Sequence, residues 1–206
     1  MRRLFNILKS KPKLKKVIHW LLIPSNEARP RLWVKWFLNP FYHTREKGSI
    51  IRSSSRLDVL PFNDFHLGRK SIIEDFTTIN NGVGNVLIGS NTFIGIGDVI
   101  IGPVEIGNNT IIAQYVVISG LNHDFQSLDL PISKQPINKK LIKIDDDCWI
   151  GANVVITSGV HIGKHSVIAA GSIVTRDVPP FSVVAGNPAR LIKQYNLKTK
   201  VWEKVD

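Results

Sequence analysis

Aliphatic residues recur at every sixth position over two long stretches of the chain. The recurring positions are Ile88, Ile94, Ile100, Ile106, Ile112 and Ile118, followed by Ile144, Ile150, Ile156, Ile162, Ile168 and Val174. A period of six is a multiple of the strand period of two, and it does not fit the helical period of 3.6. Four residues after each aliphatic position, the side chain is mostly small or β-branched. The pattern therefore predicts short parallel strands joined by corners around a prism-shaped column, which is a parallel β-helix.

The length of the repeat predicts about five coils. Three hexads make one coil of 18 residues, and a weaker first block at Leu67, Ile73 and Ile79 extends the repeat to fifteen hexads. At about 4.8 Å per coil, the column would be roughly 24 Å tall. The spacing widens from six to nine residues across residues 80–85, which predicts a bulge or corner insertion. The alternative is that the earliest hexads are chance matches.

The repeat divides the chain into three parts. We predict an all-β domain at residues 61–185, a basic and partly helical N-terminal extension at residues 1–60, and a cap at residues 186–206 that forms a short helix or tail. The repeat breaks once, at residues 119–143. Long loops on a rigid scaffold commonly carry functional residues, so we predict that residues 119–143 form an active-site loop.

Composition narrows the class of protein further. Of the 206 residues, 43% are hydrophobic and 8% aromatic, which excludes a disordered chain. No stretch approaches the roughly 18 to 20 apolar residues of a membrane span. The single cysteine, Cys148, excludes an internal disulfide and favours a cytoplasmic protein.

Almost all of the net charge lies near the N-terminus. Residues 1–47 hold 12 basic and 2 acidic residues, a net charge of +10 out of +11 for the whole chain. Apolar and aromatic residues, including Trp20, Trp33 and Trp36, lie among these charges. Such a segment could contact the inner face of an anionic membrane, or its apolar face could dock on the column or on a neighbouring subunit. A secretory signal is disfavoured because the apolar run is short, and no nucleic-acid-binding fold is visible around the charge.

The residues that open the interruption carry the candidate chemistry. His123 follows the last strand before the loop, and a histidine with its ordinary pKa near 6.5 suits a general base at neutral pH. Its neighbours Asn122 and Asp124 could bind substrate or orient the imidazole ring. A histidine beside an aspartate in a loop is more often solvated than catalytic, so this pattern alone does not decide the role of His123.

Four motifs after the loop resemble the hexapeptide-repeat acyltransferases, in particular the galactoside and maltose O-acetyltransferase branch. They are Asp147-Cys148-Trp149-Ile150-Gly151-Ala152-Asn153, Gly159-Val160-His161-Ile162-Gly163, residues 170–180 beginning Ala-Gly-Ser, and Ala185-Gly186-Asn187-Pro188-Ala189-Arg190. The resemblance covers roughly residues 67–193. It implies a left-handed β-helix and a homotrimer with acetyl-CoA bound in active sites between subunits.

The resemblance also implies roles for individual residues. His123 would be the catalytic base. The implied cofactor-binding residues are Trp149 beside the channel, Ala152 and Ala170 at the pantetheine arm, and Thr175, Arg176, Arg190 and Lys193 at the nucleotide and its phosphates. Arg176 replaces the lysine that is usual in the family, which preserves the charge. The acceptor-binding residues of the sugar acetyltransferases have no match in this chain.

The favoured interpretation is an acetyl-CoA-dependent O-acetyltransferase that acts on a sugar hydroxyl in the synthesis of a bacterial surface polysaccharide. The acceptor would be a small-molecule or lipid-linked sugar, with no nucleic acid and no metal involved. His161 and His165 do not indicate a metal site, since four-residue spacing does not put both rings on one face of a strand. An antibiotic acetyltransferase of the same fold and a non-catalytic trimeric scaffold are the alternatives.

Overall fold

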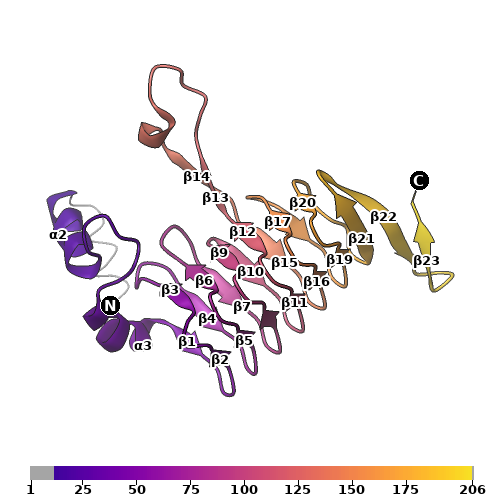
Figure 1. Cartoon of the computed structure of the whole chain (residues 1–206), viewed down its shortest axis with the longest axis horizontal. Coiled ribbons are helices and arrows are strands. Elements are labelled where there is room, and N and C mark those ends of the chain that lie inside the picture. The colour runs from indigo at the N-terminus through magenta and orange to yellow at the C-terminus, as the bar shows by residue number, and fades with distance from the viewer. Residues whose placement is uncertain (1–11, 206) are drawn as a thin grey trace.

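The computed structural model describes residues 12–205, and Figure 1 shows them as a column of stacked coils with helices at its N-terminal end. The basic residues of the segment 1–11 lie outside this range. Each complete coil contributes one short strand to each of three parallel walls, which we number in the order in which the chain meets them. The all-β parallel architecture predicted from the hexads is therefore confirmed.

The walls run along the whole column. The first consists of β1 (Thr44–Arg45), β4 (Phe65–Leu67), β7 (Val86–Ile88), β10 (Val104–Ile106), β15 (Ile142–Ile144) and β18 (His161–Ile162). The second contains β2 (Ile50–Ile51), β5 (Ile72–Ile73), β8 (Phe93–Ile94), β11 (Ile111–Ile112), β16 (Trp149–Ile150), β19 (Val167–Ile168) and β21 (Ser182–Gly186). The third contains β3 (Arg56–Asp58), β6 (Thr78–Asn80), β9 (Val99–Ile101), β12 (Val117–Ser119), β17 (Val155–Ile156) and β20 (Ile173–Val174).

The hexad residues form the core. All twelve aliphatic positions of the two long stretches are buried, as are Leu67, Ile73 and Ile79 of the weaker first block. The first block is therefore part of the fold and not a chance match. Corner hydroxyls join successive coils, as where Thr77 Oγ1 donates to the Gly95 carbonyl and Thr92 Oγ1 to the Gly107 carbonyl, both at 2.7 Å.

The predicted irregularity near residues 80–85 is a bulge at the edge between the third and first walls. Three extra residues separate β6 from β7, yet Leu67 and Ile88 remain register partners on the first wall. The buried Asn81 side chain supports the bulge because its Oδ1 accepts from the Leu60 N–H at 2.7 Å and its Nδ2 donates to the Asn63 carbonyl at 2.8 Å. The irregularity therefore leaves the walls in register.

The column has six coils, one more than the sequence predicted. Strands β1, β2 and β3 add a coil before the one that begins at β4, so the ladders start at Thr44 and not near residue 61. This coil was missed because its inward hexad position on the first wall holds Arg45, the register partner of Leu67. A charged residue at that position breaks the aliphatic pattern.

The prediction of a short C-terminal helix or tail is wrong. Residues after β21 form two antiparallel strands, β22 (Ala189–Asn196) and β23 (Val201–Lys204), which extend the second wall. The open edge of β21 provides unpaired backbone groups, and β22 satisfies them by pairing along it. Tyr195 and Trp202 then pack edge to face across the β22–β23 pair, with ring centroids 5.5 Å apart.

Within residues 12–205, three short helices pack against the first coil at the N-terminal end of the column. They are α2 (Pro12–Leu22), the π-helix η1 (Val34–Leu38) and α3 (Asn39–Tyr42). Leu22, Ile23 and Val34 are buried together with Leu60 in a small second core. The inner apolar face of this segment therefore docks on the column, as one of the two sequence interpretations expected. Within residues 12–205, no helix is long and apolar enough to cross a membrane.

Candidate active site

The interruption of the repeat forms a long hairpin that projects from the column. Its two strands are β13 (Leu121–His123) and β14 (Ile137–Lys139), which pair antiparallel, and Figure 1 shows them leaving the column after β12. The hairpin therefore starts at the edge between the third and first walls. Its base is held by Ser158 of the next coil, whose Oγ donates to the Gly120 carbonyl at 2.8 Å and accepts from the Lys140 N–H at 3.1 Å.

Gln135 organises the tip of the hairpin. Its side chain is buried, and its Nε2 donates to the carbonyls of Ser127 and Leu130 at 2.8 and 2.9 Å. Its Oε1 accepts from the Ser127 N–H at 3.2 Å. Neither Gln135 nor Ser158 was identified from the sequence, because their roles depend on contacts with distant backbone groups.

His123 lies near the base of the hairpin with an exposed side chain. It is the register partner of Ile137, and Leu121 is the partner of Lys139. Side chains of directly opposite residues in an antiparallel pair lie on the same face of the ribbon. The imidazole of His123 therefore shares one face with the side chains of Ile137 and Lys139.

The neighbours of His123 have different surroundings. Asn122 is exposed and pairs with Asn138, so its side chain lies on the opposite face of the ribbon. Asp124 Oδ1 accepts from the Gln126 N–H at 3.2 Å and so shapes the chain as it leaves β13. The sequence prediction that Asn122 and Asp124 bind substrate stays a prediction.

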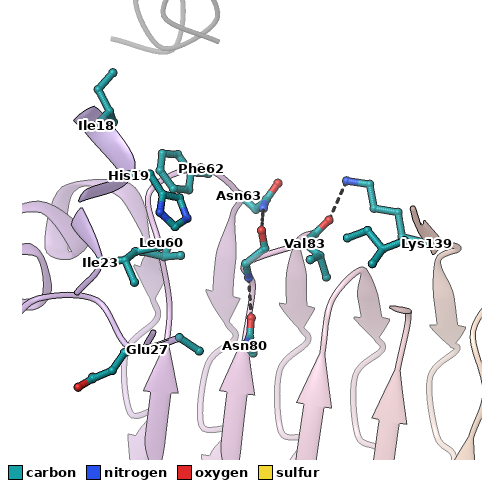
Figure 2. A pocket seen from close by; sticks show the side chains of 13 residues that line it. Ile18, His19, Ile23, Glu27, Leu60, Phe62, Asn63, Asn80, Val83 and Lys139 are labelled. Carbon is teal, nitrogen blue, oxygen red and sulfur yellow. Dashed lines mark hydrogen bonds between the residues drawn. The ribbon is translucent and has the colours of Figure 1, made fainter. Parts of the chain in front are cut away.

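A cavity of about 600 Å³ borders the hairpin face that carries His123. Ile137 and Lys139 form its hairpin side, Ile18 and Ile23 come from the N-terminal segment, and Phe62 lies between them on the column. Figure 2 shows α2 on one side of this cavity and Lys139 on the other. No pattern in the sequence predicted the cavity, because residues far apart in the chain form it.

Polar groups hold the floor of the cavity in shape. Lys139 Nζ donates to the Val83 carbonyl at 2.7 Å, which ties β14 to the bulge between β6 and β7. The Gly82 N–H donates to Asn80 Oδ1 at 2.7 Å, and Asn63 Nδ2 donates to the Gly82 carbonyl at 3.3 Å (Figure 2). The cavity therefore combines aliphatic and aromatic walls with amides and a cation, a composition that suits binding of a small polar molecule.

Part of the predicted cofactor set lies on the outer face of the second wall. Trp149 is 54% exposed there and is in register with Val167, which is in register with Val183. Lys193 of β22 pairs with Val183, and Arg190 pairs with Ala185 two residues further along β21. Since paired residues share a face, Trp149, Lys193 and Arg190 line one side of the column.

The remaining cofactor predictions fall on two edges of the prism. Ala152 and Ala170 lie in consecutive coils at the edge between the second and third walls, where the Gly171 N–H donates to the Ala152 carbonyl at 2.8 Å. Thr175 and Arg176 are exposed after β20, at the same edge as the hairpin but two coils further along. Within one chain, Trp149, Arg190 and Lys193 therefore lie on the same side of the column. His123 lies at a different edge, away from Trp149.

Two other candidates are explained by the structure. His161 Nε2 lies 2.9 Å from Asp145 Oδ2, so a contact with a neighbouring carboxylate on the surface accounts for this histidine. Within residues 12–205, no group of three histidine, cysteine, aspartate or glutamate residues is arranged to hold a metal ion. Burial raises the pKa of the Cys148 thiol to about 11, which makes it a poor nucleophile at neutral pH.

Two family profiles match the chain on either side of the hairpin. The profile "Bacterial transferase hexapeptide (six repeats)" matches residues 85–120, and "Hexapeptide repeat of succinyl-transferase" matches residues 141–176. Both parts of the column therefore resemble the hexapeptide-repeat family of bacterial transferases, as the sequence motifs predicted. The coils form the left-handed parallel β-helix of that family, so the predicted fold is confirmed.

Two of the relatives carry names of enzymes that modify saccharides. A protein of Escherichia coli K12, WbbJ, whose name assigns it to O-acetyl transfer in lipopolysaccharide biosynthesis, is 36% identical over 108 residues, which cover 49% of this chain and 55% of that protein. The galactoside O-acetyltransferase of the same strain is 38% identical over 128 residues, which cover 56% of this chain and 57% of that enzyme. The chain thus spans little more than half the length of these curated relatives.

The fold also matches that of solved structures. The N-acyltransferase AntD from Bacillus cereus, crystallised with dTDP and 3-hydroxybutyryl-CoA, superposes with a TM-score of 0.66 at 20% identity, covering 80% of this chain and 90% of AntD. At that level of identity, the likeness extends to the fold and not to the ligands.

Proposed function

We propose that this protein is an acetyl-CoA-dependent O-acetyltransferase that acts on a sugar hydroxyl, with His123 as the general base. The observation that carries the proposal is the position of His123 on the hairpin face that borders the cavity beside α2. The similarity to galactoside O-acetyltransferase and WbbJ supports a sugar acceptor, and WbbJ supports a role in surface polysaccharide synthesis.

The cavity is the proposed site for the acceptor sugar. The amide groups of Asn63 and Asn80 could exchange hydrogen bonds with sugar hydroxyls, and the ring of Phe62 provides an apolar surface for the sugar face. An acceptor bound there would present a hydroxyl to the imidazole of His123 across Ile137.

In the proposed reaction, His123 accepts the proton of the acceptor hydroxyl as its oxygen attacks the thioester carbon of acetyl-CoA. The carbon–sulfur bond then breaks, and His123 returns the proton to the departing thiolate, so that the products are an acetyl ester and free CoA. General base catalysis of this kind contributes roughly 10² to 10⁴ in rate. Cys148 takes no part, because its thiol is buried and has a raised pKa.

The proposed acyl donor is acetyl-CoA, bound by Trp149, Ala152, Ala170, Thr175, Arg176, Arg190 and Lys193. Arginine guanidinium groups suit phosphates because they donate two parallel hydrogen bonds. The hairpin that carries His123 leaves the column at the edge opposite the second wall. Trp149 and Arg190 lie on the outer face of that wall. A site that contains all three requires a second chain, which supports a homotrimer with active sites between subunits.

We propose a cytoplasmic location at the inner face of the membrane, where a small or lipid-linked sugar could reach the cavity. The reducing cytoplasm suits a protein whose single cysteine is an unpaired thiol.

The proposal is tested by measuring CoA release with a panel of sugars, nucleotide sugars and antibiotics. With the accepted substrate, His123→Ala should lower kcat by about 10² to 10⁴, while acetyl-CoA still binds. An Arg176→Ala, Arg190→Ala double variant should instead weaken acetyl-CoA binding.

Three results would contradict the proposal in different ways. Full turnover by His123→Ala would show that His123 is not the base. Turnover with antibiotics alone would show that the acceptor is an antibiotic and not a sugar. A protein with no affinity for CoA would be a scaffold and not a transferase.

A further inference from the structure

The N-terminal segment has a second, outward apolar face that the column does not cover. Its inner face is buried through Leu22 and Val34. On the outer side, large apolar side chains remain exposed along all three helices. They are Val17, Trp20 and Leu21 of α2, Leu32 and Trp33 before η1, Trp36 and Phe37 of η1, and Phe41 of α3.

The exposure of the aromatic residues is unusually high. Trp36 is 70% exposed, Phe37 68% and Phe41 80%. Soluble proteins rarely leave large apolar side chains grouped at the surface unless that surface binds something. Because burial of the inner face already fixes these helices to the column, docking on the column does not account for the outer residues.

The charge of the segment points to one partner. Residues 12–45 hold seven lysines and arginines but only one acidic residue, Glu27. Arg31 lies over the ring of Trp20 at 5.4 Å and its Nε donates to the Trp20 carbonyl at 3.1 Å, so charge and aromatic surface are joined where α2 meets the chain leading to η1. The other 159 residues of the chain, from Gly48 onward, carry only about +1.

Aromatic rings next to lysines and arginines are the composition that binds the headgroup region of an anionic bilayer. Tryptophan is favoured there because its ring is apolar and its N–H is polar. We propose that the outer face of α2, η1 and α3 binds the surface of an anionic membrane without crossing it. In Figure 1 these helices occupy one end of the column, away from β16 to β22, where the proposed donor residues lie.

This orientation has a consequence for the proposed acceptor site. The α2 helix contributes Ile18 and His19 to the cavity, while Val17, Trp20 and Leu21 of the same helix remain exposed. A bilayer against the outer face would lie next to the cavity, within reach of a sugar carried on a lipid. Membrane binding itself does not require acetyl transfer, so the two proposals can fail separately.

The test is co-sedimentation of the full chain with vesicles, without acetyl-CoA or acceptor. The probes are vesicles of phosphatidylcholine alone and vesicles containing about 30% phosphatidylglycerol. We expect binding to the anionic vesicles, at least tenfold weaker binding to the neutral ones, and weakening by added salt because exposed charges are screened. The triple variant Trp36→Ala, Phe37→Ala, Phe41→Ala should reduce binding to the anionic vesicles by at least tenfold.

A matched control comes from the hairpin. Phe125, Leu128 and Leu130 are also exposed, and replacing all three with alanine removes a comparable amount of apolar surface elsewhere. This control should bind vesicles like the unmodified protein. No vesicle binding, equal binding to both vesicle types, or equal loss in both triple variants would overturn the proposal. A change of oligomeric state in the Trp36, Phe37 and Phe41 variant, measured by sedimentation velocity, would show instead that this face contacts another subunit.

Discussion

Asp98 is a carboxylic acid inside the aliphatic column. It lies at the corner between β8 and β9, and its side chain is fully buried. Oδ1 accepts from the Val116 N–H at 2.7 Å, but within residues 12–205 Oδ2 has no hydrogen-bond partner. Burial raises the pKa of Asp98 from 3.8 to about 7, because the charged form loses its hydration.

This raised pKa makes stability depend on pH in a defined direction. Between about pH 4 and pH 7 the folded protein keeps the proton of Asp98, whereas the unfolded chain releases it. The contribution of Asp98 to stability is therefore complete below about pH 4 and is lost as the pH rises to about 7. A difference of about three pKa units corresponds to about 4 kcal/mol, an order-of-magnitude figure.

Asp98→Asn should remove this dependence. The amide oxygen can still accept from the Val116 N–H, but the side chain cannot ionise. At pH 8 the variant should be more stable than the unmodified protein by a few kcal/mol, on the scale of that shift, and near pH 4 the two should be similar. The exposed Asp129 provides a control, since Asp129→Asn should leave the pH profile unchanged.

The assay is urea unfolding at a fixed protein concentration and a series of pH values, because subunit association would also affect the midpoint. If the stability of the unmodified protein and that of Asp98→Asn changed with pH in parallel, the reasoning would be refuted. That outcome would mean that the buried carboxyl is compensated in a way the contacts of Asp98 do not reveal.

Two further predictions concern the coil interior. A Cβ on Gly95 would clash with the Ala113 carbonyl oxygen of the next coil, so Gly95→Ala should destabilise the fold by about 1–3 kcal/mol in urea unfolding. An unchanged midpoint would mean that the coils can separate locally. The thiol of Cys148 should react with a thiol reagent at pH 8 slowly in the folded protein and rapidly in urea. The reason is that burial in the folded protein raises the pKa of the thiol to about 11. Fast labelling of the folded protein would contradict that burial.

The hexads predicted the interior well because each inward position has the same surroundings in every coil. The first coil was missed at Arg45, although Ile51 and Leu57 continue the spacing of six and pack against the core. An end coil has a neighbour on one side only, so its inward positions need not all be aliphatic. The β22–β23 pair was missed because it depends on the open edge of β21, which is a property of the folded wall and not of residues 189–204 themselves.

The candidate site was only partly predictable for a related reason. The break in the repeat located the hairpin and His123, since local sequence determines where the hexads stop. Lys139 reaching Val83 and the contribution of Ile18 to the cavity join residues that are far apart in the chain. No spacing within the sequence could have predicted those contacts.

The prism geometry makes a final prediction about how sites are assembled. His123 is at the base of a hairpin that starts opposite the second wall, and Trp149 and Arg190 lie on the outer face of that wall. If each proposed site takes His123 from one subunit and the other two residues from its neighbour, two inactive variants should complement each other. We would mix His123→Ala with a Trp149→Ala, Arg190→Ala double variant, and exchange subunits by mild denaturation and refolding.

In any mixed trimer, one of the three sites receives intact residues from both subunits, whatever the composition. Random exchange of equal amounts leaves about a quarter of all sites intact, so about a quarter of the unmodified activity should return. Mixing His123→Ala with His123→Asn is the control and should restore nothing, because every site then lacks the base. Failure of the first mixture, after exchange has been verified by mass spectrometry of tagged subunits, would mean that His123 and the second wall do not serve one site. The proposed intersubunit arrangement would then be wrong even if acetyl transfer itself were established.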